Sequence, residues 1–185
     1  DSHDTDRLFS MIINPNRDYN TGARLNETKS YKDIRPDLFA PDAVAKMKLI
    51  SMIQMTYTGA PMIYYGDETG IWGAADPHDR KPMMWPEEMP FDKATDDLEK
   101  YRQSITAGKI SKQVEIDEEN KLVKYPPEIN GEIEAWYKKV IAIRNNDKEL
   151  YGSANLEYVV ADDEKDIVAF VRRLDNRSSI TVINN

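Results

Sequence analysis

The spacing of apolar residues changes once along this chain, near residue 150, and this change limits the folds open to it. Upstream, residues 41–57 and 132–146 carry apolar side chains at the spacing of amphipathic helices. Downstream, three strand-like segments, 156–161, 167–174 and 179–185, are separated by the turn sequences DDEKD and DNRS. The pattern predicts an antiparallel β unit, separate from a helix-containing portion.

The helix-containing portion also includes a short apolar run at residues 61–65, PMIYY, bounded by Gly59 and Gly66. Such a run between turn signals predicts a strand buried on both faces, as in a parallel sheet. Because it directly follows the predicted helix 41–57, the order of elements favours an α/β fold. We place the boundary with the β unit near Leu150.

The rest of this portion contains shorter elements. Helical turns are predicted at residues 5–13, and a short helix is predicted to begin near Thr95. Residues 14–40 and 105–127 are polar and are interpreted as a loop and an irregular insertion.

Composition excludes several classes of function. The net charge of −8 gives little electrostatic support for a nucleic-acid partner. The chain has no cysteine, which removes disulfides and thiolate chemistry, and no apolar stretch long enough to span a bilayer.

Because the chain starts at Asp1 without methionine and stops within a strand-like segment, we expect it to be a piece of a longer protein.

The candidate functional residues lie in two short stretches, DSHDTDR at the start and DPHDR at 76–80. His3 and Asp4 alone are a weak signal, and Asp76 and Arg80 could form a simple loop ion pair. Parallel strands, however, deliver functional residues at their C-terminal ends. The loop after residues 61–65 is aromatic and carries paired charges, a combination that suits a polyhydroxy ligand.

A metal-dependent phosphohydrolase is the first alternative, since a His-Asp pair is found in such enzymes. The chain has 2 histidines, His3 and His78, and such sites generally draw on several imidazoles or a dense cluster of carboxylates. This chain could not assemble such a site by itself.

Four stretches resemble the α-amylase family, glycoside hydrolase family 13, particularly its neopullulanase and cyclomaltodextrinase branch. They are DSHDTDR, GAPMIYYGDETG, DPHDRKPMMW, and the passage from WYKKVIAIRN into VAFVRRL. The resemblance implies an α/β fold, namely the C-terminal portion of a (β/α)8 TIM barrel around strands seven and eight. Residues 1–150 would form this part of the barrel, and residues 151–185 the first strands of an all-β sandwich.

The same resemblance implies roles for individual residues. Asp4 would stabilise the transition state by gripping hydroxyls of the sugar beside the scissile bond, and His3 would bind the same sugar. These contacts strengthen as the sugar ring flattens toward an oxocarbenium ion, so they lower the barrier. Asp76 and Arg80 would bind a sugar further from the cut, and Arg7 would have a structural role.

The implied activity is that of a retaining hydrolase of α-1,4-glucosidic bonds in starch-derived glucans, pullulan or cyclodextrins, with α-1,6 bonds left open. The nucleophile and general acid would come from the fourth and fifth barrel strands, upstream of Asp1, so we expect the chain alone to be inactive. Glu68 would be a hydrogen-bonding residue of the barrel interior.

The remaining expectations concern ligands and alternatives. The expected partner is an α-glucan oligosaccharide or polysaccharide, with no nucleic acid and no membrane span, and self-association stays open. No metal or other cofactor is expected in this chain, whereas calcium stays open for the rest of the parent protein. A transglycosylase of the same family and a non-catalytic glucan-binding or assembly protein are the alternatives; the His3–Asp4 and Asp76/Arg80 pairs argue against the latter.

Overall fold

The computed structural model describes residues 1–15, 35–74, 78–83, 92–94, 98–107, 115–119, 121–124, 130–152 and 154–184. They fall into two compact units. The first unit combines Asp1–Val44 with Tyr64–Glu134, and the second combines Ala45–Ile63 with Ala135–Asn185.

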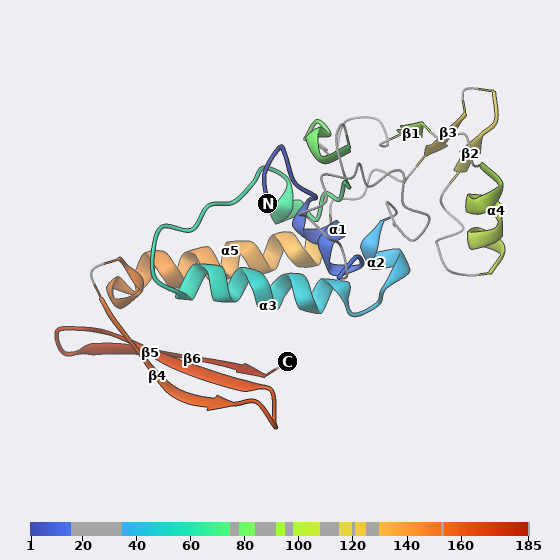
Figure 1. The fold of residues 1–185 in the computed structure, drawn as a ribbon. Helices are drawn as coiled ribbons and strands as arrows, with labels where there is room; N and C mark the ends of the chain where they lie inside the picture. The colour runs from blue at the N-terminus through green and yellow to red at the C-terminus, as the bar shows by residue number, and fades with distance from the viewer. Residues whose placement is uncertain are drawn as a thin grey trace. The chain divides into compact units, whose positions relative to one another are not determined.

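The first unit contains short elements. Its helices are α1 (Leu8–Ile12), α2 (Pro36–Phe39) and α4 (Leu98–Thr106), with 3₁₀ turns η2 (Asp67–Thr69) and η3 (His78–Arg80). A small antiparallel sheet has the strand order β1-β3-β2, formed by Asp92–Ala94, Leu122–Lys124 and Glu115–Asp117 (Figure 1). The helices predicted at 5–13 and near Thr95 are confirmed as α1 and α4.

The prediction of irregular structure over residues 105–127 is wrong in part, because β2 and β3 pair within this segment. Each strand has 3 residues, which is too short for an alternating pattern to stand out in a charged sequence. Val123 of β3 is nonetheless fully buried.

The core of the first unit forms where α1 meets residues 71–74. Phe9, Ile71 and Trp72 are buried there. The backbone N–H of Arg7 donates to the carbonyl of Gly73 at 2.8 Å. The N–H of Gly73 in turn donates to Ser10 Oγ at 2.9 Å. These two bonds join the start of the chain to the segment that follows η2.

Residues 61–65 form no strand, so the prediction of a strand buried on both faces is wrong for this structure. Met62 is 69% exposed and Tyr65 is 41% exposed. A strand exists only where a neighbouring strand accepts its backbone hydrogen bonds. Among the described residues no strand pairs with this segment.

The second unit contains most of α3 (Ala43–Thr56) and α5 (Gly131–Asn146), the turn η4 (Lys148–Leu150) and a three-stranded sheet. The sheet has the order β4-β5-β6, formed by Asn155–Asp162, Ile167–Leu174 and Arg177–Asn184 (Figure 1). Both strand pairs are antiparallel, and the β4–β5 register shifts between Tyr158 and Val160. The two long helices and the antiparallel unit predicted from periodicity are therefore confirmed.

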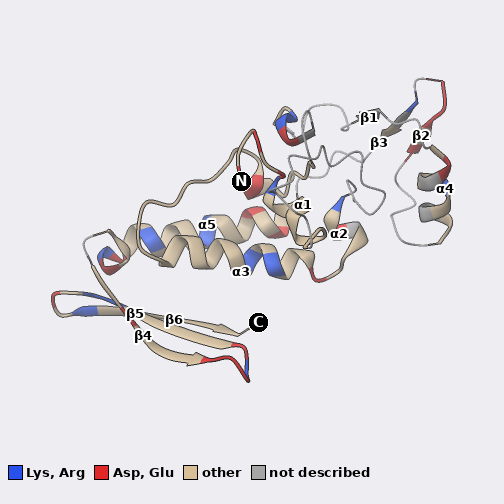
Figure 2. Cartoon of the chain, in the orientation of Figure 1, with Lys and Arg blue, Asp and Glu red and all other residues tan. Residues whose placement is uncertain are grey.

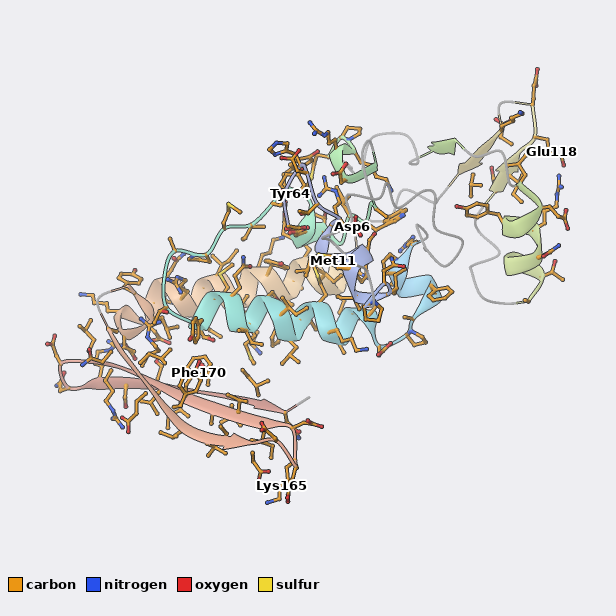
Figure 3. The ribbon with its side chains drawn as sticks, in the orientation of Figure 1. Asp6, Met11, Tyr64, Glu118, Lys165 and Phe170 are labelled. Carbon is orange, nitrogen blue, oxygen red and sulfur yellow. The ribbon has the colours of Figure 1, made fainter. Side chains whose placement is uncertain are left out.

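The core of the second unit lies between its helices and one face of the sheet. Phe170 points from β5 toward the helices of this unit (Figure 3). Its ring meets Tyr57, just after α3, edge to face with centroids 5.6 Å apart. Tyr137 and Val140 of α5 are buried, as expected for the apolar face predicted for this helix.

Two buried arginines donate hydrogen bonds to the carbonyls at the C-terminal end of α3. Arg144 of α5 donates to the carbonyls of Met55 and Gly59, each at 2.6 Å. Arg172 of β5 donates to the carbonyl of Thr56 at 3.2 Å. Burial, together with the nearby charge of Arg144, lowers the pKa of Arg172 below its usual range. Two elements distant in sequence thus satisfy the carbonyls that end this helix.

Acidic and basic side chains are interspersed along the described elements of both units (Figure 2). No helix in the described part of the chain is long and apolar enough to cross a membrane.

Candidate active site

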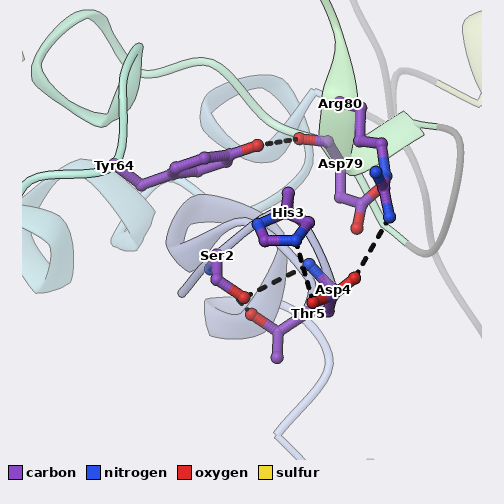
Figure 4. A network of polar contacts seen from close by, with 7 residues as sticks. All are labelled: Ser2, His3, Asp4, Thr5, Tyr64, Asp79 and Arg80. Carbon is purple, nitrogen blue, oxygen red and sulfur yellow. Dashed lines mark hydrogen bonds and ion pairs between the residues drawn. The ribbon is translucent and has the colours of Figure 1, made fainter.

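Asp4 lies in a tight turn at the start of the first unit. The backbone N–H of Ser2 donates to Thr5 Oγ1 at 2.9 Å, and the N–H of Thr5 donates to the Ser2 carbonyl at 3.3 Å. The N–H of Asp4 itself donates to Ser2 Oγ at 3.2 Å (Figure 4). Hydroxyl side chains commonly stabilise turns in this way, so the sequence around Asp4 holds its own backbone in place.

Each oxygen of the Asp4 carboxylate faces a nitrogen. His3 Nε2 lies 3.0 Å from Oδ2, and Arg80 Nη2 donates to Oδ1 at 3.1 Å (Figure 4). The three side chains are 61%, 66% and 47% exposed for His3, Asp4 and Arg80. An exposed ion pair of this kind contributes under about 1 kcal/mol, so hydroxyls of a ligand can compete for the same carboxylate.

Arg7 anchors the segment that carries Asp4. Its side chain is fully buried, and Nη1 donates to the carbonyl of Tyr65 at 2.6 Å. Its guanidinium carbon lies 4.5 Å from the ring centroid of Tyr64 and 4.6 Å from that of Tyr65. A cation over two aromatic faces is a stabilising contact. This placement agrees with the structural role expected for Arg7.

Tyr64 and Tyr65 extend from this contact to η3, the turn that carries Arg80. The hydroxyl of Tyr65 donates to the carbonyl of Lys81 at 2.6 Å, and that of Tyr64 donates to the carbonyl of Asp79 at 3.4 Å. Burial, then the hydrogen bond with Tyr65, raises the pKa of Tyr64 above its usual value. Tyr64 therefore stays protonated, and a donor, at neutral pH.

The turn after these tyrosines holds two carboxyl groups in different surroundings. Glu68 Oε2 accepts the backbone N–H of Gly66 at 2.9 Å. Asp67 is 3% exposed, and its Oδ1 has no hydrogen-bond partner. Burial raises the pKa of Asp67 to about 7, although the positive charge of Arg7 acts in the opposite direction.

The structure thus brings together three of the four predicted site residues, His3, Asp4 and Arg80. Asp76 lies outside the described residues. Asp67 and the roles of Tyr64 and Tyr65 were not predicted, because a GDE triplet is typical of a turn and paired tyrosines are typical of a core. Within the described residues, no group of three or more acidic or histidine side chains is placed to hold a metal ion.

Comparison with known proteins places this segment in a family, although no protein-family model matches the chain. A cyclomaltodextrinase of Thermoanaerobacter pseudethanolicus is 34% identical over 143 residues, which cover 77% of this chain and 17% of that protein. Neopullulanase 2 of Thermoactinomyces vulgaris is 58% identical over 43 residues, 23% of this chain and 7% of that protein.

A solved cyclomaltodextrinase structure matches the fold with a TM-score of 0.55 and 25% identity, over 100% of this chain and 20% of that one. The chain belongs to the α-amylase family, glycoside hydrolase family 13. Within it, the similar proteins include cyclomaltodextrinases, a neopullulanase and amylopullulanases. The chain spans 17% of the length of the cyclomaltodextrinase from T. pseudethanolicus.

Proposed function

We propose that this chain supplies the transition-state-stabilising part of the active site of a retaining glycoside hydrolase that acts on α-glucans. The observation that carries the proposal is the exposed Asp4 carboxylate, held in a tight turn with a nitrogen beside each oxygen. A carboxylate so placed accepts hydrogen bonds from sugar hydroxyls, which become more acidic as positive charge develops on the ring.

The neighbouring residues have supporting roles in this proposal. His3 binds the same sugar as Asp4, and Arg80, with Asp76, binds a sugar further from the cleaved bond. A retaining mechanism needs a nucleophile and a general acid, two carboxyl groups about 5–5.5 Å apart. In this proposal both come from segments outside this chain, as its resemblance to the family implies.

The fold proposal matches this assignment. Residues 1–150 form the last part of a (β/α)8 barrel, and residues 151–185 begin an all-β sandwich. The antiparallel sheet that begins at Asn155, directly after α5 and η4, supports this division. The segment 61–65 then becomes a barrel strand once neighbouring strands are present to accept its hydrogen bonds.

The relatives suggest the substrate class. They are named cyclomaltodextrinase, neopullulanase and amylopullulanase, so we propose starch-derived glucans, pullulan or cyclodextrins for the protein that contains this chain. We propose that this protein cleaves α-1,4 bonds. Hydrolysis of pullulan tests whether it also cleaves α-1,6 bonds.

The test uses the full-length protein with β-cyclodextrin and pullulan as substrates. Asp4→Asn removes the negative charge and keeps the shape of the side chain, and we expect kcat to fall about 100-fold or more. Asp163→Asn, at an exposed turn of the sheet, is the matched control and leaves kcat unchanged. Equal activity of the two variants would refute the assignment, and product analysis separates hydrolysis from glycosyl transfer.

A further inference from the structure

Asp4 and Arg80 lie 76 positions apart in the sequence, and the contact between them depends on where η3 is held. This 3₁₀ turn has 3 residues. Such short pieces are not stable by themselves, so their position is set by the groups that bind them. Groups outside η3 must therefore hold Arg80 in place.

Tyr64 and Tyr65 bind the backbone on either side of Arg80. Their hydroxyls donate to the carbonyls of Asp79 and Lys81, the residues immediately before and after Arg80. The bond from Tyr65 measures 2.6 Å and that from Tyr64 3.4 Å, so Tyr65 makes the stronger of the two contacts. Arg80 is thus held on both sides through its backbone neighbours.

The tyrosines are in turn tied to the segment of Asp4. Arg7, three residues after Asp4, is buried against both tyrosine rings and donates to the Tyr65 carbonyl. A closed circuit of contacts therefore runs from Asp4 through Arg7 and Tyr65 to Arg80, and the Asp4–Arg80 ion pair completes it. All its members belong to the first unit.

We propose that Tyr65, assisted by Tyr64, is a positioning residue that sets Arg80 against Asp4 for sugar binding. The inference deepens the proposed function and rests on it. Tyr65 touches no substrate in this scheme and acts through Arg80. Its effect therefore falls on the binding of the sugar that Arg80 contacts, further from the cleaved bond, and hence on KM more than on kcat.

The first test is Tyr65→Phe in the full-length protein, with maltohexaose as substrate. This variant keeps the ring that Arg7 contacts and removes the hydroxyl that binds Lys81. We expect KM to rise roughly threefold to tenfold, the effect of one lost hydrogen bond, with kcat changed less than twofold. Tyr64→Phe is expected to change KM in the same direction by less.

The matched control is Tyr151→Phe. Tyr151, in the second unit, also donates its hydroxyl to a backbone carbonyl, that of Asn145 at 3.2 Å. This control variant leaves both kinetic constants unchanged. If Tyr65→Phe fails to fold, judged by its thermal transition, Tyr64→Phe carries the test by the same criterion.

A second measurement separates positioning from a merely structural role. If Tyr65 acts through Arg80, the double variant Tyr65→Phe/Arg80→Ala has the KM of Arg80→Ala alone. Additive changes in KM, or a KM of Tyr65→Phe equal to that of Tyr151→Phe, overturn the inference while the proposed function stands. A wild-type protein that hydrolyses no α-glucan overturns both together.

Discussion

Asp67 is a carboxyl group whose surroundings make its ionisation costly. Its pKa rises from 3.8 to about 7 mainly because of burial, so the folded state binds a proton more tightly than the unfolded state. The stabilisation that protonated Asp67 provides is fully present below about pH 4. It is lost as the pH rises toward 7. Over that interval the contribution of Asp67 to the free energy of unfolding falls by roughly 4 kcal/mol.

We therefore expect Asp67→Asn to weaken the pH dependence of stability. The amide keeps the shape of the protonated acid and cannot ionise, so the variant gains stability over wild type at pH 7.5 and gains none at pH 4. Urea denaturation at the two pH values measures the difference. Asp163→Asn, exposed at a turn, is the control, and equal pH dependence of all three proteins would contradict the buried ionisation.

Gly66 lies at a position that has no room for a side chain. Its φ is +89°, and a Cβ built there would lie 2.4 Å from Ile71 Cδ1. We expect Gly66→Ala to lower the free energy of unfolding by about 1–3 kcal/mol. Gly131→Ala, where the added Cβ meets nothing within 4 Å at the start of α5, is expected to be neutral or stabilising. Equal denaturation midpoints for the two variants would refute this reading of Gly66.

At the scale of elements, α3 shows how a helix end depends on the rest of the fold. The last turn of α3 has no basic residue of its own. Arg144 and Arg172 reach its final carbonyls from α5 and β5 and place positive charge at the negative end of the helix dipole. The sequence of α3 alone therefore does not stabilise its C-terminus.

Neighbouring arginines on β5 allow a test of the buried contacts of Arg172, which reach the last carbonyl of α3 and three carbonyls outside it. Arg172 is fully buried on four carbonyls, whereas Arg173 is 55% exposed and lies 3.6 Å from Glu157. We expect Arg172→Met to cost about 1–3 kcal/mol for each carbonyl left without a donor. Arg173→Met is expected to change the free energy of unfolding by under about 0.5 kcal/mol. Thermal denaturation in which both variants lose equal stability would contradict the stabilising role of the buried Arg172.

The length of an element decided whether its sequence predicted it. The two long helices and the antiparallel sheet could be predicted, because their apolar spacing extends over many residues. Strands β2 and β3 were missed because 3 residues contain too little pattern. The composition of residues 61–65 is typical of a buried strand. A strand also needs a neighbouring strand to pair with, and the sequence of the segment does not reveal whether one is present.

At the scale of the whole molecule, the proposed mechanism divides the active site between this chain and the remainder of its parent protein. We expect the 185-residue chain alone to release no reducing sugar from maltohexaose, because the proposed function assigns the nucleophile and the general acid to segments outside it. The full-length protein serves as the positive control. Detectable hydrolysis by the purified chain, retained on a second purification, would contradict the division.

The two long helices, the antiparallel sheet and the family could be predicted from the sequence, because periodicity and short motifs are local properties of the chain. The sequence also placed His3 beside Asp4, since adjacent residues in a turn stay close in any fold. Three features are visible only in the folded chain: Arg80 pairs with Asp4, the Tyr65 hydroxyl binds the Lys81 carbonyl, and Asp67 is buried. Apolar spacing indicates which face of an element is buried, whereas the partner of a side chain depends on the path of the whole chain.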